Sequence, residues 1–131
     1  MRILIAEDDL STRTLLTKLL SPYGRCEVAV NGREAIECFR LALDEQEPYE
    51  LVCLDIMMPE NDGHQVLASI RAQEETRGIA GLEAVKVIMI SALDDSKNVL
   101  GAFKQGCEAY LTKPINKDQL VDRLRNLGLV S

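Results

Sequence analysis

Short continuous apolar runs alternate along this chain of 131 residues with segments in which apolar residues recur at helical spacing. Such runs are typical of strands buried on both faces of a sheet, and they lie at residues 3–6, 26–30, 51–54, 85–90 and 109–111. Strict alternation of strand and helix with short connections favours a parallel sheet covered by helices on both sides. We therefore predict an α/β fold, a doubly wound five-stranded parallel sheet flanked by five helices.

Helical spacing places the five helices around residues 15–20, 35–43, 66–70, 99–103 and 120–127. Three of their starts carry a capping pattern, a short polar acceptor three residues before an acidic or amide side chain, in Asn31 with Glu34, Asp62 with Gln65, and Asn116 with Gln119. Gly24 and Gly106 are expected to end the first and fourth helices in the left-handed conformation. Residues 71–84 show no clear period, and we predict a loop or a frayed helix end there.

Length and charge limit the classes of function. We expect one domain over residues 1–131, because this length can bury a substantial core. The net charge of -6 opposes direct binding to nucleic acid or an anionic membrane. Acidic residues from Glu7 onward interrupt the first apolar run too early for a signal peptide or a membrane span, so we expect a cytoplasmic protein. The four cysteines lack C-x-x-C spacing, which disfavours a metal or disulfide role.

Polar side chains follow four of the five predicted strands. Glu7 and Asp8 follow the first strand, Asp55 the third, Ser91 the fourth and Lys113 the fifth. An isolated aspartate at a strand end is more often simply solvated. Because the carboxyl ends of parallel strands meet at one edge, where ligands bind at the topological switch point, these side chains are expected to lie together.

This combination of residue types suits phosphoryl transfer to a carboxylate. Glu7, Asp8 and Asp55 offer the hard oxygen ligands that Mg²⁺ prefers. Asp55 would be the nucleophile, while Lys113 and Ser91 would meet the charge of the transferred phosphoryl group. A divalent cation and Lys113 would together balance the three carboxylates, so the sequence predicts a reaction that depends on a divalent metal.

The residues Glu7-Asp8, Asp55, Ser91 and Lys113-Pro114, in this order and at these strand ends, resemble the receiver domain of two-component response regulators, in particular the single-domain chemotaxis type. The resemblance covers essentially the whole chain and implies a flavodoxin-like sheet of order 2-1-3-4-5. It also implies that the backbone carbonyl of Met57 binds the metal and that Lys113-Pro114 is a cis peptide. Ser91 and Tyr110 would be the switch residues.

By this resemblance the chain accepts a phosphoryl group on Asp55 from a sensor histidine kinase or a histidine phosphotransfer protein. It would then bind a downstream protein through the face formed by the fourth helix, fifth strand and fifth helix, roughly residues 94–127, and it would not be a turnover enzyme. One alternative is a phosphate-independent interaction module on the same fold. A phosphatase with an aspartate nucleophile is disfavoured, because Met57 stands where a D-x-D motif needs its second aspartate. A flavodoxin-like cofactor binder is disfavoured by the acidic loop at Glu7-Asp8-Asp9, which would repel a phosphate.

Overall fold

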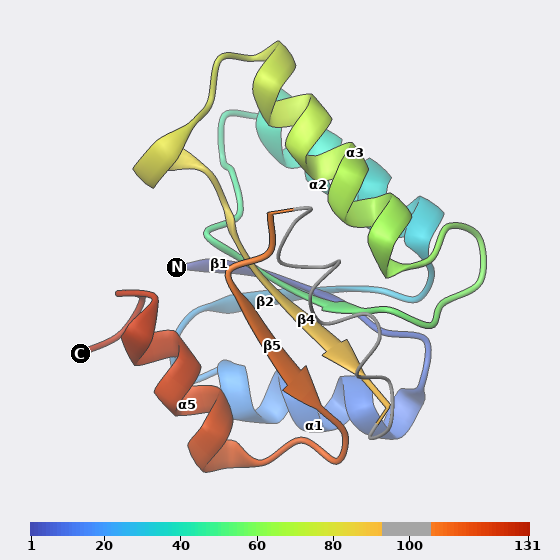
Figure 1. The fold of residues 1–131 in the computed structure, drawn as a ribbon, viewed down its shortest axis with the longest axis vertical. Coiled ribbons are helices and arrows are strands. Elements are labelled where there is room, and N and C mark those ends of the chain that lie inside the picture. Colours follow the sequence, from blue (N-terminus) through green and yellow to red (C-terminus); the bar gives the residue numbers. More distant parts are fainter. Residues whose placement is uncertain (93–105) are drawn as a thin grey trace.

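A single parallel sheet forms the centre of the molecule in the computed structural model, which describes residues 1–92 and 106–131 (Figure 1). Its strand order is β2-β1-β3-β4-β5, so the predicted fold class and the strand order implied by the resemblance are both confirmed. No strand end differs from the prediction by more than one residue. The strands are β1 (Arg2–Ala6), β2 (Arg25–Ala29), β3 (Leu51–Asp55), β4 (Lys86–Ser91) and β5 (Ala109–Thr112).

Helices cover both faces of the sheet, as Figure 1 shows. One face carries α1 (Leu10–Leu20) and α5 (Lys117–Asn126), and the other carries α2 (Gly32–Asp44) and α3 (Gly63–Thr76). The helix predicted around residues 99–103 lies outside the described residues. Within the described ranges, no helix is both long and apolar enough to cross a bilayer.

Alternate residues of the buried strands form two separate cores. Leu4, Val52 and Met89 pack on the α2 and α3 side, where Phe39 and Ile70 are buried. Their neighbours along the strands face α1 and α5, among them Ile3, Cys53, Ile88, Leu16 and Leu120. Because both faces are covered, the strands are apolar throughout, which is why they appear in the sequence as unbroken runs.

The three predicted helix caps are confirmed. The side chains of Asn31 and Asn116 each accept a hydrogen bond from the backbone amide three residues later. Asp62 forms a complete capping box with Gln65, in which each side chain accepts from the other residue's amide. The cap of α3 fixes the chain direction only a few residues after β3 ends.

The two glycine predictions had different outcomes. Gly106 adopts a φ of 101°, as expected, although the helix that it was to end lies outside the described residues. Gly24 was interpreted wrongly, because it is not among the glycines with positive φ. A Cβ at Gly24 would lie 2.2 Å from the carbonyl oxygen of Met1, so close backbone packing is what requires glycine there.

The prediction of a loop or frayed helix end over residues 71–84 was wrong for its first residues. Helix α3 continues to Thr76, and a short 3-10 helix follows at Gly81–Glu83.

Arg71 bridges two carboxylates, Glu74 and Glu108, each at 2.7 Å. These carboxylates accept the amides of Val85 and Val87 at 2.7 and 2.6 Å. The side chains of Glu74 and Glu108 thus accept hydrogen bonds from backbone amides at the start of β4. Glu108 itself directly precedes β5.

Replacing Arg71 with Met is expected to destabilise the fold by about 3 kcal/mol, because it leaves two poorly solvated carboxylates without their cation. Urea unfolding monitored by circular dichroism measures this loss. Arg40→Met is the control, since Arg40 forms exposed pairs with Glu37 and Asp44 on α2 and should cost about 1 kcal/mol or less. Equal losses in the two variants would contradict a special role for the Arg71 cluster.

Candidate functional site

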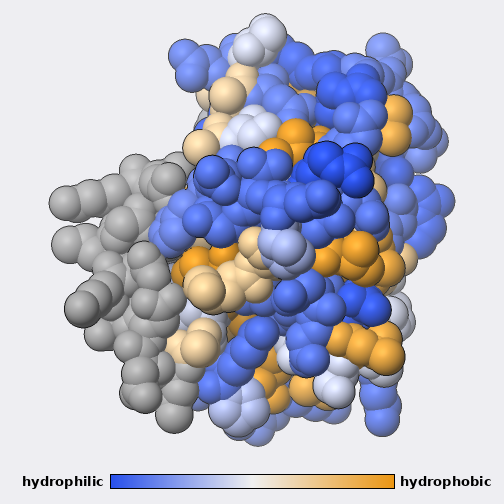
Figure 2. Space-filling view, turned by 90° about the vertical axis from the view of Figure 1, so that its right-hand side faces the viewer, coloured by the Kyte–Doolittle hydropathy of each residue, from blue (hydrophilic) through white to orange (hydrophobic). Residues whose placement is uncertain are grey.

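The carboxyl ends of β1 and β3 lie side by side in the middle of the sheet. The chain runs from β1 outward to β2 and later returns to β3 on the other side of β1, so the direction of winding reverses between β1 and β3. Ligands bind at such a switch point in open α/β sheets. The molecular face seen in Figure 2, which is the right-hand side of Figure 1, is mostly hydrophilic with several separate hydrophobic patches.

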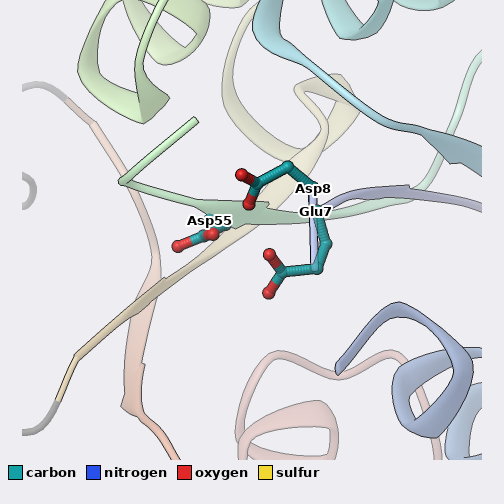
Figure 3. Close-up of side chains that lie close together, drawn as sticks. All are labelled: Glu7, Asp8 and Asp55. Carbon is teal, nitrogen blue, oxygen red and sulfur yellow. The ribbon is translucent and has the colours of Figure 1, made fainter. Parts of the chain in front are cut away.

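Three carboxylates gather at this point. Glu7 and Asp8 follow β1 and Asp55 ends β3, and one oxygen of each lies within 4.8 Å of the others (Figure 3). The structure therefore brings together the three acidic residues that the sequence predicted as metal ligands. Their burial differs, because Glu7 and Asp55 are buried whereas Asp8 is exposed.

Glu7 has the most unusual environment of the three. Its side chain is fully buried, which raises the pKa of the carboxyl, and the neighbouring Asp55 raises it further. The amide of Asp9, which donates to Glu7 Oε2 at 3.2 Å, and the ammonium of Lys113 act in the opposite direction. On balance burial prevails, and the pKa of the Glu7 carboxyl is raised.

Lys113 connects the two buried carboxylates. Its Nζ lies 3.0 Å from Glu7 Oε1 and 3.3 Å from Asp55 Oδ2. Burial alone would lower the pKa of the ammonium, but the two carboxylates outweigh it and the pKa is raised. The Lys113-Pro114 peptide is cis, as the resemblance implied. The backbone amide of Lys113 donates to Ser91 O at 2.8 Å, which holds the end of β5 against β4.

Backbone contacts hold Asp55 in place. The amide of Ile56 donates to Ile90 O at 2.9 Å, and the amide of Met57 donates to Asp55 Oδ1 at 3.3 Å. A Cβ on Gly63 would lie 2.7 Å from Asp55 O, so the start of α3 packs directly against this backbone. Glycine at position 63 is therefore needed for close approach.

The remaining predicted residues lie around the cluster. Ser91 is fully buried at the end of β4, and its Oγ donates to Ala92 O at 3.2 Å. Tyr110 is buried on β5 opposite Met89, on the sheet face that carries α2 and α3. The side chain of Met57 is 68% exposed. The roles of Ser91, Tyr110 and Met57 in metal binding and switching stay predictions.

Sequence reasoning missed several residues that shape the site. Asp9 caps α1 by accepting from the amide and hydroxyl of Thr12, at 3.0 and 2.7 Å, so α1 begins at Leu10 rather than near Leu15. Asp9 is a residue type that commonly caps helices. However, Thr12 stands three residues later, where the other caps have Glu or Gln. Gly32 packs beneath the loop after Asp55, where a Cβ would lie 1.8 Å from Asn61 O. Nothing in the local sequence shows that contact.

The donor set fits a hard divalent cation. All three nearby groups are carboxylates, and such oxygens are the ligands that Mg²⁺ takes. Glu7 Oε1 is buried, and its charged neighbour is the ammonium of Lys113 at 3.0 Å. A buried carboxylate oxygen in this state is suited to a cation, and the exposed Asp8 leaves the cluster open to solvent on one side.

Comparisons with known protein sequences agree with this geometry. The family model for the response regulator receiver domain matches residues 3–125. The chain is 32% identical to the chemotaxis protein CheY of Listeria monocytogenes over 126 residues, which is 95% of each protein. It is also 32% identical to a probable transcriptional regulator, ycf27, of Cyanophora paradoxa, but there it spans only 47% of the relative's length.

Solved structures extend the comparison to three dimensions. CheY of Borrelia burgdorferi, solved in complex with CheX, BeF3 and magnesium, superposes with a TM-score of 0.83 at 25% identity, covering 100% of this chain and 90% of that one. The receiver domain of the Pseudomonas aeruginosa sensor histidine kinase PA1611, with magnesium in its active-site cleft, gives a TM-score of 0.76 at 26% identity and covers 97% of both chains.

Proposed function

This chain belongs to the response regulator receiver domain family of two-component signalling, whose members are signalling modules rather than turnover enzymes, and we propose that it stores a phosphoryl group on Asp55. The observation that carries the proposal is the position of Lys113, whose ammonium lies within 3.3 Å of Asp55 and within 3.0 Å of Glu7, beside Asp8. Residues 1–131 would act as one receiver domain.

In the proposed reaction an oxygen of Asp55 attacks the phosphorus of a phosphohistidine. The new O–P bond forms as the P–N bond breaks, and the electron pair stays on the imidazole nitrogen, which takes up a proton. Asp55 is held for this attack because its Oδ1 accepts the amide of Met57 while Oδ2 faces Lys113. Positioning and charge neutralisation supply most of the catalysis in phosphoryl transfer.

We propose Mg²⁺ as the cofactor, held by Glu7, Asp8 and Asp55 together with the backbone carbonyl of Met57. When bound, it would neutralise negative charge on the phosphoryl oxygens. Lys113 would move its contact from Asp55 to the phosphoryl group, and the hydroxyl of Ser91 would turn from Ala92 O to donate to the same group. Ser91 ends β4 and Lys113 follows β5, and these two strands are neighbours in the sheet.

The proposed phosphodonor is a sensor histidine kinase or a histidine phosphotransfer protein. The proposed target binds the face that includes β5 and α5, roughly residues 94–127, and phosphorylation would shift an equilibrium between two conformations of that face through Ser91 and Tyr110. The buried position of Tyr110 supports this, because a change in its packing would alter the surface of β5. Residues 94–105 of this predicted face lie outside the described part of the chain.

Incubation with acetyl phosphate and Mg²⁺, followed by intact mass spectrometry, is expected to show a gain of one phosphoryl group. The gain should disappear when a chelator replaces Mg²⁺, because the carboxylates would then repel the donor. Equal labelling with and without chelator would sink the metal-assisted mechanism. Absence of labelling under both conditions would favour a phosphate-independent module, and steady release of inorganic phosphate over many turnovers would favour a phosphatase.

A further inference from the structure

Arg13, in the first turns of α1, contacts the backbone of the acidic cluster. Its Nη1 donates to Glu7 O at 3.1 Å and to Asp8 O at 3.4 Å. Arg13 lies within α1, in the part that precedes the apolar residues from Leu15 onward. One guanidinium nitrogen thus lies against both carbonyls of the two residues that follow β1.

The base of Arg13 is itself firmly held. Its own amide donates to Asp9 O at 2.9 Å, and its carbonyl accepts from the hydroxyl of Thr17 at 2.8 Å. Asp9 closes the same turn by capping the amide of Thr12. The guanidinium therefore extends from a capped helix, and its position relative to the end of β1 is well defined.

The two carbonyls lie just beyond the paired part of β1. Pairing of β1 with both neighbours ends at Ala6, and only the amide of Glu7 still donates across, to Ala29 O at 3.0 Å. Burial and the amide of Asp9 fix the Glu7 side chain. The side chain of Asp8 is exposed, so it has no surrounding side chains to hold it. The direction of its carboxylate therefore depends on the position of its backbone.

We propose that Arg13 is a positioning residue for the cation site: by holding the carbonyls of Glu7 and Asp8 it keeps the Asp8 carboxylate aimed at the cluster, and it strengthens cation binding without touching the ion. This inference rests on the proposed function, since it assumes that the cluster binds a divalent cation. Residues outside the coordination sphere that orient ligands commonly change metal affinity tenfold or more.

The positive charge of Arg13 acts in the opposite direction. A guanidinium beside the cluster repels a divalent cation, so loss of that charge alone would tighten binding. Positioning predicts weaker binding when Arg13 is replaced, and simple electrostatics predicts stronger binding. The sign of the change therefore separates the two roles.

The test is isothermal titration of the full chain with MgCl₂, comparing wild type with Arg13→Gln, Arg13→Lys and Arg123→Gln. The last variant removes the same charge from α5, where Arg123 pairs with Asp122. We expect about tenfold weaker binding in Arg13→Gln, a smaller loss in Arg13→Lys, which keeps the charge but not the planar donor group, and no change in Arg123→Gln. Urea unfolding in chelator would report any loss of stability separately.

Unchanged or tighter binding by Arg13→Gln would overturn the inference, as would wild-type affinity in Arg13→Lys. A weakening in Arg123→Gln equal to that in Arg13→Gln would also overturn it, because the loss would then not depend on the contacts that Arg13 makes with the carbonyls of Glu7 and Asp8. Failure of the wild type to bind Mg²⁺ would instead contradict the proposed cofactor, so the two failures are distinguishable.

Discussion

Asp55→Asn is expected to gain no phosphoryl mass with acetyl phosphate and Mg²⁺ over a period that fully labels the wild type. The amide of asparagine is a poor nucleophile, and no other carboxylate of the cluster has the contacts of Asp55 with both Met57 and Lys113. The variant keeps the shape of the side chain and an oxygen to accept the Met57 amide. Its fold should therefore survive, and urea unfolding should confirm this.

Asp62→Asn is the matched control for this result. It makes the same chemical change only a few residues away, at the N-cap of α3, where asparagine is as good a cap as aspartate. We expect it to be labelled like the wild type. Labelling of Asp55→Asn at the wild-type rate would show that Asp55 is not the acceptor, whereas loss of labelling in both variants would indicate disturbance of the loop between β3 and α3.

The sheet and its acidic edge could be predicted because both depend on local patterns. Strands buried on two faces appear as apolar runs, and the residue after each run lies at the carboxyl edge once the strands are parallel. The positions of the strand ends alone therefore predicted correctly that Glu7, Asp8, Asp55 and Lys113 lie together. The strand order was not available in this way and came from the resemblance.

Contacts between distant segments could not be predicted. Arg71 bonds to Gly106 O and Glu108 across more than thirty positions of sequence, and no periodicity reports such a pair. These contacts involve the part of α3 that follows its apolar pattern. Arg13 was missed for a related reason: the start of α1 was placed too late, so the residue was not recognised as lying one turn from the cluster.

Lys113→Met is expected to destabilise the metal-free protein by about 3 kcal/mol at pH 8, the low end for removing one partner of a buried ion pair. The variant leaves the fully buried Glu7 and the neighbouring Asp55 without their shared cation. Urea unfolding in chelator measures the loss. Lys117→Met, at the exposed start of α5, is the control and should change stability by about 0.5 kcal/mol or less.

The loss should be smaller at pH 5.5 than at pH 8, and this dependence separates charge from packing. The pKa of Glu7 is already raised in the folded protein, and Lys113 is one of the groups that restrain it, so the variant should raise it further. A carboxyl whose pKa is higher in the folded than in the unfolded state binds more protons when folded. The variant therefore loses stability relative to wild type as the pH rises between these two pKa values.

Mg²⁺ should restore more stability to the variant than to wild type, because it replaces the missing positive charge in the folded state alone. An equal loss at both pH values, unaffected by Mg²⁺, would mean that Lys113 stabilises the fold through its aliphatic chain rather than through its charge.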